Sequence, residues 1–328
     1  MNYVIGAGAV GTFIAGYLTA AGHQPTLVVR PQRRSNYDSD RLRIDRPGAG
    51  ATMRLPSPRI TSRPAYADAS RVFICTKRAQ LPDVAASLAG QLPDNCLVLP
   101  CVNGVGAEQV IAQALPGQPC APVYVMSNMR VVAPLHIQLN TAAELIVETT
   151  GRDALKLFRG TGLKARAAAP GSGWGKLLIN LNNAIGALCQ SGFTDMFAHP
   201  QLRQAYLLCL DEAVATLEAA GQPYTMPAPV SYGVYRWLLA RVPALPLWVA
   251  RRKNGLSDEA YPSMCVDLEA GRVTEVGFLN GAVVDLAARL DRRAPVNQRV
   301  VELVEARHGQ TAPTPLDPAA LLEELQAA

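Results

Sequence analysis

The stretch Gly6-Ala7-Gly8-Ala9-Val10-Gly11 is a GxGxxG motif that directly follows a β-rich run and opens a helical one. In such a motif the first glycine permits a tight turn, the second lets the backbone approach a pyrophosphate, and the third lets the helix pack on the strand. The N–H groups and the dipole of the helix N-terminus then favour an anion. Small residues also serve close packing of strand and helix, but this setting favours dinucleotide binding by Gly6, Gly8, Ala9, Val10 and Gly11.

Around this motif, short β-rich runs alternate with helical runs, which is typical of a parallel sheet covered by helices. Strands are expected at residues 3–5, 26–29, 72–75, 97–99 and 123–127, and helices at residues 10–21, 81–90 and 107–114. Strand-like segments at residues 136–139, 143–149 and 163–168 complete this half of the chain.

A cluster of residues that break regular structure, Pro170-Gly171-Ser172-Gly173, indicates a domain boundary. Beyond it the pattern is helical, and helices are expected at residues 174–189, 200–221, 232–241, 263–269, 275–291 and 297–308. We therefore predict an α/β fold with two domains: a Rossmann-type dinucleotide-binding domain over residues 1–169 and an all-α domain over residues 170–328.

Composition and charge exclude several classes of protein. With 49% apolar and 17% charged residues, the 328-residue chain can bury large cores. Its net charge of +5 is carried without a basic block longer than Arg251-Arg252-Lys253, so no nucleic-acid partner is expected. No run reaches the roughly 18 apolar residues of a spanning helix, and no signal peptide is evident. We expect a cytoplasmic protein without a membrane partner.

The seven Cys include no CxxC pair, and the four His have no metal-ligand spacing. Reduced thiols, no disulfide framework and no metal site are therefore expected.

Arginine follows the second expected strand, where an acidic side chain would bind the ribose 2′-OH of NAD. Arg30 holds that place, Arg33 and Arg34 come next, and no acidic residue precedes Asp38. Cations at this point suit a 2′-phosphate, so NADP(H) is favoured over NAD(H). Alternatively, Arg33 and Arg34 are a solvated loop pair.

Two further turns follow expected strands, at the edge where open α/β sheets bind ligands. Lys77 follows the strand at residues 72–75 and could contact an anionic part of the ligand. Asn103 follows the strand at residues 97–99 and could hydrogen-bond the nicotinamide or its ribose, although Asn103-Gly104 is also a common turn dipeptide.

The first helix of the second domain is apolar nearly all round, except for a polar line of Lys176, Asn180 and Asn183. At 100° per residue these three side chains share one face. Buried amides and ammonium groups without partners are costly, so the line indicates a polar cleft, or else a satisfied structural network. Later in the chain, Ser263 and Asp267 are one helical turn apart, and Glu275 precedes a new helix, where an acid could simply stabilise the helix dipole.

Together, GAGAVG at residues 6–11, VNG at 102–104, WGKLLIN at 174–180 and SMCVDLEAGRVTEVGFLNG at 263–281 resemble the ketopantoate reductase family over most of the chain. The resemblance implies NADPH-dependent reduction of a 2-oxo acid, 2-dehydropantoate, to (R)-pantoate on the pantothenate route. It also implies that Lys176 donates the proton and that Glu275 is its acidic partner. Asn103 would position cofactor and substrate, and Asn180 and Ser263 would contact the substrate. Asn183, on the same polar line, is a further candidate for substrate contact.

Lysine suits the proton-donating role because none of the four His lies in a motif and arginine scarcely deprotonates. This sequence departs from the family pattern at Ala184, where an asparagine is expected, at Val266, and in a long segment over residues 226–262. Two alternatives follow: a reductase of a different 2-oxo compound, or a redox-inactive NADPH-binding sensor whose long segment recruits a partner through exposed aromatic residues. A homodimer is compatible with each.

Overall fold

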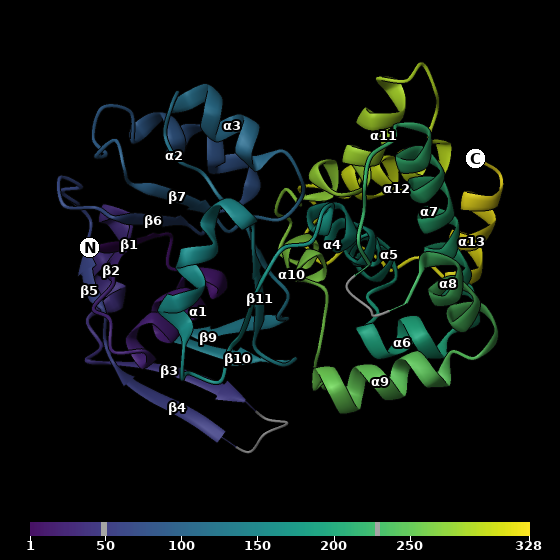
Figure 1. Ribbon diagram of the computed structural model, residues 1–328. Coiled ribbons are helices and arrows are strands. Elements are labelled where there is room, and N and C mark those ends of the chain that lie inside the picture. The colour runs from purple at the N-terminus through teal and green to yellow at the C-terminus, as the bar shows by residue number, and fades with distance from the viewer. Residues whose placement is uncertain (47–50, 227–229) are drawn as a thin grey trace. The chain divides into compact units, whose positions relative to one another are not determined.

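The computed structural model describes residues 1–46, 51–226 and 230–328. The chain divides into two compact units (Figure 1). The α/β unit comprises Met1–Val102 and Gly106–Ala169, and the helical unit comprises Asn103–Val105 and Pro170–Ala328. The predicted fold class, a Rossmann-type α/β part followed by an all-α part, is confirmed.

A five-stranded parallel sheet in the order β5-β2-β1-β6-β7 forms the centre of the α/β unit. Its strands are β1 (Asn2–Ile5), β2 (Thr26–Val28), β5 (Arg59–Thr61), β6 (Arg71–Ile74) and β7 (Leu97–Pro100). Alternate residues enter opposite cores: Val4 and Phe73 pack with α1 (Ala9–Ala20), whereas Tyr3 and Val72 pack with the apolar residues of α2 (Leu81–Ser87) and α3 (Ala107–Ala114). Burial on both faces explains the continuous apolar runs that predicted these strands.

A second sheet, in the order β4-β3-β10-β9, packs over α1. Close approach is possible because Gly16 of α1 has no side chain: a Cβ there would lie 2.7 Å from the Cδ1 atom of Ile44 in β3. The strands are β3 (Arg41–Arg46), β4 (Ala51–Pro56), β9 (Met129–Ala133) and β10 (His136–Leu139). Strands β3, β4, β5 and β9 were not predicted, because their charged or exposed residues mask the alternation of strand residues.

One expected strand belongs to a different sheet. Residues 123–127 were expected to extend the parallel sheet, but β8 (Val123–Val125) pairs antiparallel with β11 (Glu144–Val147). With β12 (Lys164–Ala167), these strands form a separate three-stranded sheet. Before β8, the chain pairs in parallel with β7 only at the isolated bridge between Val98 and Cys120. It then leaves the parallel sheet, so β8 is free to join another sheet.

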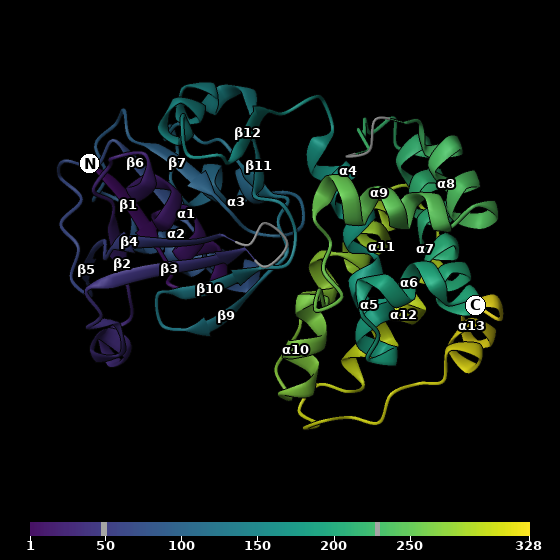
Figure 2. The same cartoon turned by 90° about the horizontal axis from the view of Figure 1, so that it is seen from below.

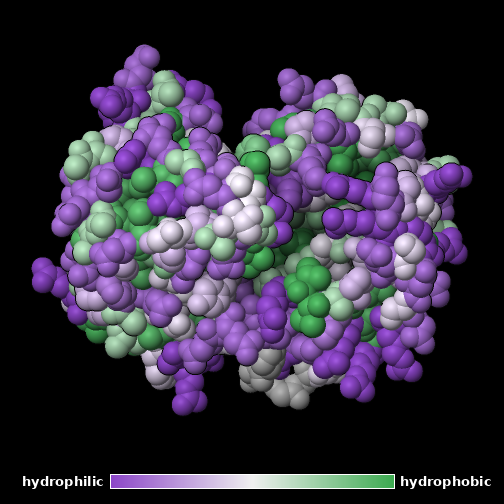
Figure 3. Space-filling model, turned by 180° about the vertical axis from the view of Figure 1, so that it is seen from behind, coloured by the Kyte–Doolittle hydropathy of each residue, from purple (hydrophilic) through white to green (hydrophobic). Residues whose placement is uncertain are grey.

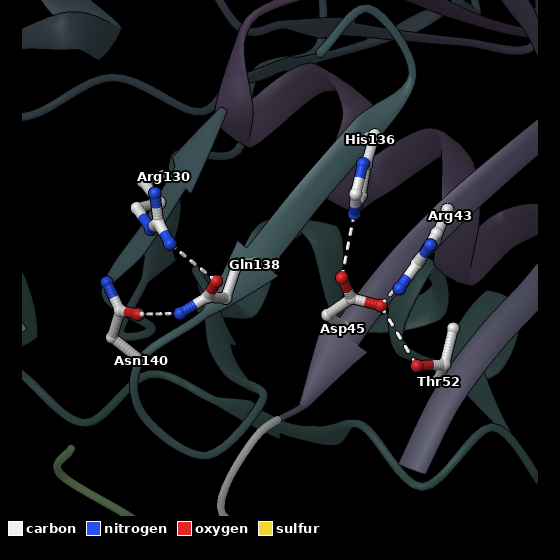
Figure 4. Close-up of polar contacts among 7 residues, drawn as sticks. All are labelled: Arg43, Asp45, Thr52, Arg130, His136, Gln138 and Asn140. Atoms are coloured by element: carbon white, nitrogen blue, oxygen red, sulfur yellow. Dashed lines mark hydrogen bonds and ion pairs between the residues drawn. The ribbon is translucent and has the colours of Figure 1, made fainter. Parts of the chain in front are cut away.

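Polar side chains cross-link the second sheet (Figure 4). Asp45 accepts hydrogen bonds from Arg43, at 2.7 Å, and from Thr52, at 2.9 Å, and its other oxygen lies 2.7 Å from His136 Nε2. Burial opposes ionisation of this carboxyl, but the contacts with Arg43, His136 and Thr52 outweigh that cost and lower the pKa of Asp45 to about 2. These contacts tie β3 to both β4 and β10.

The helical unit is built around α4 (Ser172–Asn180), α5 (Asn182–Cys189) and the long α7 (Pro200–Ala219), whose apolar residues share one core (Figures 1 and 2). The remaining helices are α6 (Phe193–Ala198), α8 (Tyr232–Arg241), α9 (Ala244–Asn254), α10 (Ser263–Glu269), α11 (Asn280–Ala288), α12 (Pro295–Glu305) and α13 (Pro318–Gln326). The sequence analysis missed α6 and α9. The single helix expected at residues 275–291 is wrong: Val276–Phe278 forms a 3-10 turn and α11 begins only at Asn280.

Three expectations from composition concern the molecule as a whole. All seven Cys are free thiols, and no group of His, Cys, Asp or Glu in the described ranges could hold a metal ion. No helix within the described residues is long and apolar enough to cross a membrane. On the face shown in Figure 3, hydrophilic residues predominate and hydrophobic ones occur in scattered groups.

Gly175 tests how tightly the helical unit is packed. A Cβ at this position of α4 would lie 1.7 Å from the carbonyl oxygen of Thr225, which is backbone and cannot move aside. Gly175→Ala should lower the free energy of unfolding by about 3 kcal/mol or more. Gly233→Ala in α8, where nothing lies within 4 Å, is the matched control and should be neutral or slightly stabilising. Thermal unfolding followed by circular dichroism measures both, and equal midpoints would contradict this packing.

Candidate active site

Three of the predicted site residues form a hydrogen-bonded chain within the helical unit. Lys176 Nζ donates to Asn103 Oδ1 at 3.0 Å, and Asn103 Nδ2 donates to Glu275 Oε2 at 3.1 Å. Asn103 and Glu275 are 172 residues apart in the sequence. A cation, an amide and a carboxylate are thus held in line, with the amide between the two charges.

Lys176 is a buried cation on an apolar helix. It is only 8% exposed, and its helix neighbours Leu177 and Leu178 belong to the core of the helical unit. A buried ammonium is tolerated only where it is hydrogen-bonded, and Asn103 supplies an acceptor. The local fold places it there: α4 begins after Gly171, whose φ of +76° and close approach to Pro223 exclude other residues.

Asn103 reaches the helical unit through the segment Asn103–Val105, which packs with that unit although it follows β7. Gly104 makes this possible: its φ is +84°, and a Cβ would lie 2.6 Å from the carbonyl oxygen of Phe278. Val105 packs against the helical core. The Asn103-Gly104 dipeptide is therefore more than a turn, and Gly104 is a positioning residue that the sequence analysis did not single out.

Glu275 occupies the N-cap position of the 3-10 turn Val276–Phe278. The alternative interpretation was an acid that merely stabilises a helix dipole, yet its carboxylate accepts a hydrogen bond from Asn103. The next residue, Val276, is buried in the helical core and anchors this turn.

The other predicted substrate contacts lie on neighbouring elements of the same unit. Asn180 is the last residue of α4 and is half-buried, Asn183 is buried in α5, and Ser263 is exposed at the start of α10. Leu181 keeps right-handed helical angles, so the polar line continues from α4 into α5. Among the described residues, no hydrogen bond joins Asn180, Asn183 or Ser263 to the chain Lys176–Asn103–Glu275.

The structure also locates the residues at which this sequence departs from the family pattern. Ala184 is fully buried in the helical core, so its side chain offers no polar group to a ligand. Val266 is exposed on α10. Asp267, one turn after Ser263, contacts Arg272 Nε at 3.0 Å and thereby links α10 to the loop that follows.

The glycine-rich turn packs closely on α1 and leaves open space at Gly8. Gly6 adopts a φ of +98°, and a Cβ at Gly11 would lie 1.7 Å from the carbonyl oxygen of Gly6, so α1 packs directly on the turn. Gly8 caps α1 and has nothing within 4 Å of where its Cβ would be. No acidic residue occupies the first turn of α1, where an anion would be favoured. Ala9 and Val10 are half-buried at the same helix end.

The residues expected near the rest of a dinucleotide are exposed. Arg30 caps the 3-10 helix Pro31–Tyr37, and Lys77 caps the turn Arg78–Gln80 after β6. Arg34 is paired with Asp38 at 2.6 Å, whereas Arg30 and Arg33 form no ion pair within the described part of the chain.

Tyr37, which sequence reasoning missed, donates a hydrogen bond to the Ala7 carbonyl at 3.2 Å. This contact ties the arginine-bearing 3-10 helix to the glycine-rich turn. The sequence signal that could have identified Tyr37 is that it is an aromatic residue within an arginine-rich stretch.

The free space beside Gly8 allows a test of whether this glycine serves ligand binding or packing. Gly8→Ala should leave the unfolding midpoint unchanged, because the added methyl group meets no protein atom. If a pyrophosphate approaches this backbone, the same methyl group should weaken dinucleotide binding by at least about tenfold. Fluorescence titration with NADPH measures the affinity, with Gly233→Ala as control. Unchanged affinity would remove the turn from the binding site.

Comparisons with known proteins bear on what this arrangement does. The family model described as ketopantoate reductase PanE/ApbA matches residues 2–151, and the model of its C-terminal part matches residues 171–308. A 2-dehydropantoate 2-reductase of Halobacterium salinarum is 26% identical over 328 residues, covering 92% of this chain and 96% of that protein.

Two solved structures share the fold over 94% of this chain and 98% of theirs. One is a PanE/ApbA family ketopantoate reductase from Ralstonia eutropha JMP134, with a TM-score of 0.76 and 24% identity. The other is a D-mandelate dehydrogenase with NADH and anilino(oxo)acetate, with a TM-score of 0.76 and 17% identity.

Proposed function

Because this chain belongs to the ketopantoate reductase family, whose members are oxidoreductases acting on a CH–OH group, we propose that it reduces 2-dehydropantoate to (R)-pantoate with NADPH. The observation that carries this proposal is the chain Lys176–Asn103–Glu275, in which a buried ammonium is held by an amide. A ketone reductase needs such a group, because the oxygen of its substrate gains negative charge as the carbon is reduced.

The α/β unit fits the cofactor. The free space at Gly8, the helix N-terminus behind it and the exposed Arg30 and Arg33 suit a pyrophosphate and a 2′-phosphate. Gly6, Ala9, Val10 and Gly11 would line the pyrophosphate, Lys77 would contact an anionic part of the ligand, and Asn103 would hydrogen-bond the nicotinamide or its ribose. When bound, NADPH supplies the hydride that adds to the ketone carbon.

Lys176 has two roles in this mechanism. Its ammonium hydrogen-bonds the ketone oxygen, which draws negative charge onto that oxygen, and it then gives the oxygen a proton to form the hydroxyl. Atoms and charge balance, since the carbon gains a hydride, the oxygen gains a proton and the lysine is left neutral until solvent reprotonates it. No His takes part in the site.

Asn103 and Glu275 hold that lysine in position. The Asn103 amide lies between the two charged groups, since it accepts a hydrogen bond from Lys176 and donates one to Glu275. The carboxylate also fixes the amide orientation, because Nδ2 must face Glu275 and Oδ1 must face Lys176. Asn180, Asn183 and Ser263 are proposed to orient the substrate carboxylate and hydroxyl.

Removing the ammonium tests the proton-donating role. Lys176→Ala should lower kcat for 2-dehydropantoate by at least about a hundredfold, because a positioned general acid is lost, while NADPH affinity is retained. Lys164→Ala, which removes an exposed lysine of β12, is the matched control. Steady-state assays of NADPH oxidation and a fluorescence titration separate the two effects. Nearly normal turnover in Lys176→Ala would exclude this lysine from catalysis.

Removing the arginines tests the cofactor preference. The double variant Arg30→Ala/Arg33→Ala should weaken NADPH binding by at least about tenfold and leave NADH binding unchanged, because only NADPH carries the 2′-phosphate. Arg41→Ala in β3 is the control, since Arg41 is exposed and follows the same loop. Equal affinity of the unaltered protein for NADH and NADPH would refute the preference itself.

A second candidate function is reduction of a different, bulkier 2-oxo acid. Ala184 is the observation behind it, because the polar amide that the family pattern has at this position is absent and the contact it would make is lost. The D-mandelate dehydrogenase of the same fold, whose structure contains NADH and anilino(oxo)acetate, shows that the fold accommodates an aromatic 2-oxo acid analogue. Values of kcat/KM for 2-dehydropantoate and for a panel of aromatic and branched 2-oxo acids decide between the two. Absence of NADPH oxidation with every compound would favour the redox-inactive sensor.

A further inference from the structure

The net charge of the protein is concentrated in one stretch of the helical unit. Between Glu218 and Asp258 the sequence contains five basic residues and no acidic one, and the rest of the chain has equal numbers of both. This stretch therefore accounts for the whole formal charge of +5. It includes α8 and α9; its residues 227–229 lie outside the described residues.

The same stretch exposes large apolar side chains in a repeated pattern. On α8 the exposed residues Val234, Trp237 and Arg241 are spaced i, i+3, i+7, and on α9 the exposed residues Leu245, Trp248 and Arg252 repeat that spacing. Such spacing places the three side chains of each helix on one face. Each helix thus carries a line of one aliphatic residue, one tryptophan and one arginine.

These side chains contribute little to the core of the helical unit. Trp237 is 56% exposed and Trp248 is 54% exposed, whereas Trp174 in α4 is buried. No described residue of α9 is buried, and Figures 1 and 2 show α9 at the periphery of its unit. Exposed apolar residues that occur singly need no explanation, but a cluster of them indicates an interaction surface.

Three of the five cations are available to a partner. Arg236 contacts Asp211 and Arg251 contacts Asp258, so the charges of those two arginines are balanced. Arg241, Arg252 and Lys253 are exposed and form no ion pair within the ranges that the structure describes. The surface formed by α8 and α9 therefore combines exposed tryptophans with unbalanced positive charge.

We propose that α8 and α9 adsorb to an anionic phospholipid surface, with Trp237 and Trp248 at the headgroup level and Arg241, Arg252 and Lys253 against the lipid phosphates. Exposed tryptophans and clustered basic residues are groups that bind membrane interfaces. A second copy of the chain fits less well, because a symmetric contact through this surface would bring like charges together. An acidic protein partner would need a groove that buries the exposed aliphatic residue and tryptophan of each helix.

Adsorption differs from the spanning mode that the sequence excluded. The expectation of no membrane partner rested on the absence of a long apolar run, and no described helix is long enough to cross a bilayer. Adsorption to the surface needs no such length, because exposed aromatic residues contact the headgroup region and neighbouring cations contact anionic lipids. The proposal is independent of the proposed reaction.

Vesicle binding tests the proposal directly. The full chain is mixed with phosphatidylcholine vesicles that either contain about one-third phosphatidylserine or lack it, and binding is measured by co-sedimentation and by tryptophan fluorescence. We expect binding to the anionic vesicles only, with a blue shift from the exposed tryptophans. Binding should fall steeply between 0.01 M and 0.15 M salt, where the Debye length shortens from about 30 Å to about 8 Å. No binding to anionic vesicles at low salt overturns the proposal.

Two variants and a matched control locate the contact. Trp237→Ser/Trp248→Ser and Arg241→Gln/Arg252→Gln/Lys253→Gln should each lower partitioning by at least about tenfold. The control, Arg289→Gln/Arg292→Gln/Arg293→Gln, removes three exposed cations of the same unit and should retain binding. Equal loss in the control would overturn the proposal by showing that only total charge matters. A dimer in light scattering that the tryptophan variant abolishes, without vesicle binding, would assign the surface to a second copy instead.

Discussion

The arrangement of the helical unit depends on a buried cation. Lys176 lies on an apolar helix with almost no exposure, and an ammonium in that setting must be hydrogen-bonded or it destabilises the fold. Asn103 meets that requirement without neutralising the charge, and Glu275 fixes the orientation of the amide. Under the proposed function, stability and chemistry are linked at this point, since the contact that makes the buried lysine tolerable would also present it to a substrate oxygen.

Glycine residues allow the backbone segments to come close enough for this contact. Gly104 lets the Asn103–Val105 segment lie against the carbonyl of Phe278, and Gly175 lets α4 lie against Thr225. Any side chain at either position would occupy the space of a backbone atom. The dinucleotide turn obeys the same constraint at Gly11, where α1 contacts the carbonyl of Gly6. In both units, close backbone packing positions polar groups more firmly than flexible side chains could.

Local patterns in the sequence predicted the parts of the fold that local physics determines. The glycine motif, the apolar central strands and the long helices were found because each carries its signal within a few residues. The strand β3 was missed because arginines alternate with Leu42 and Ile44 and hide a buried face behind charge. The contact from Asn103 to Glu275 spans 172 residues, so spacing could nominate both residues but could not show that they meet. Tyr37 was missed for the same reason, since its partner Ala7 lies on another element.

Charge is arranged in opposite ways at the two proposed functional sites of the helical unit. At Lys176 a single cation is buried, and one amide lies between it and a carboxylate. The electrostatic interaction of this ammonium with a ligand therefore depends on low exposure and fixed geometry. On α8 and α9 several cations are exposed, and the sequence between Glu218 and Asp258 contains no acidic residue. The attraction of these cations for an anionic surface therefore depends on how many they are and on low salt. A small substrate is recognised by geometry, whereas an extended anionic surface is recognised by charge density. Because the two requirements are met on separate elements, the exposed residues of α8 and α9 can vary without disturbing Lys176.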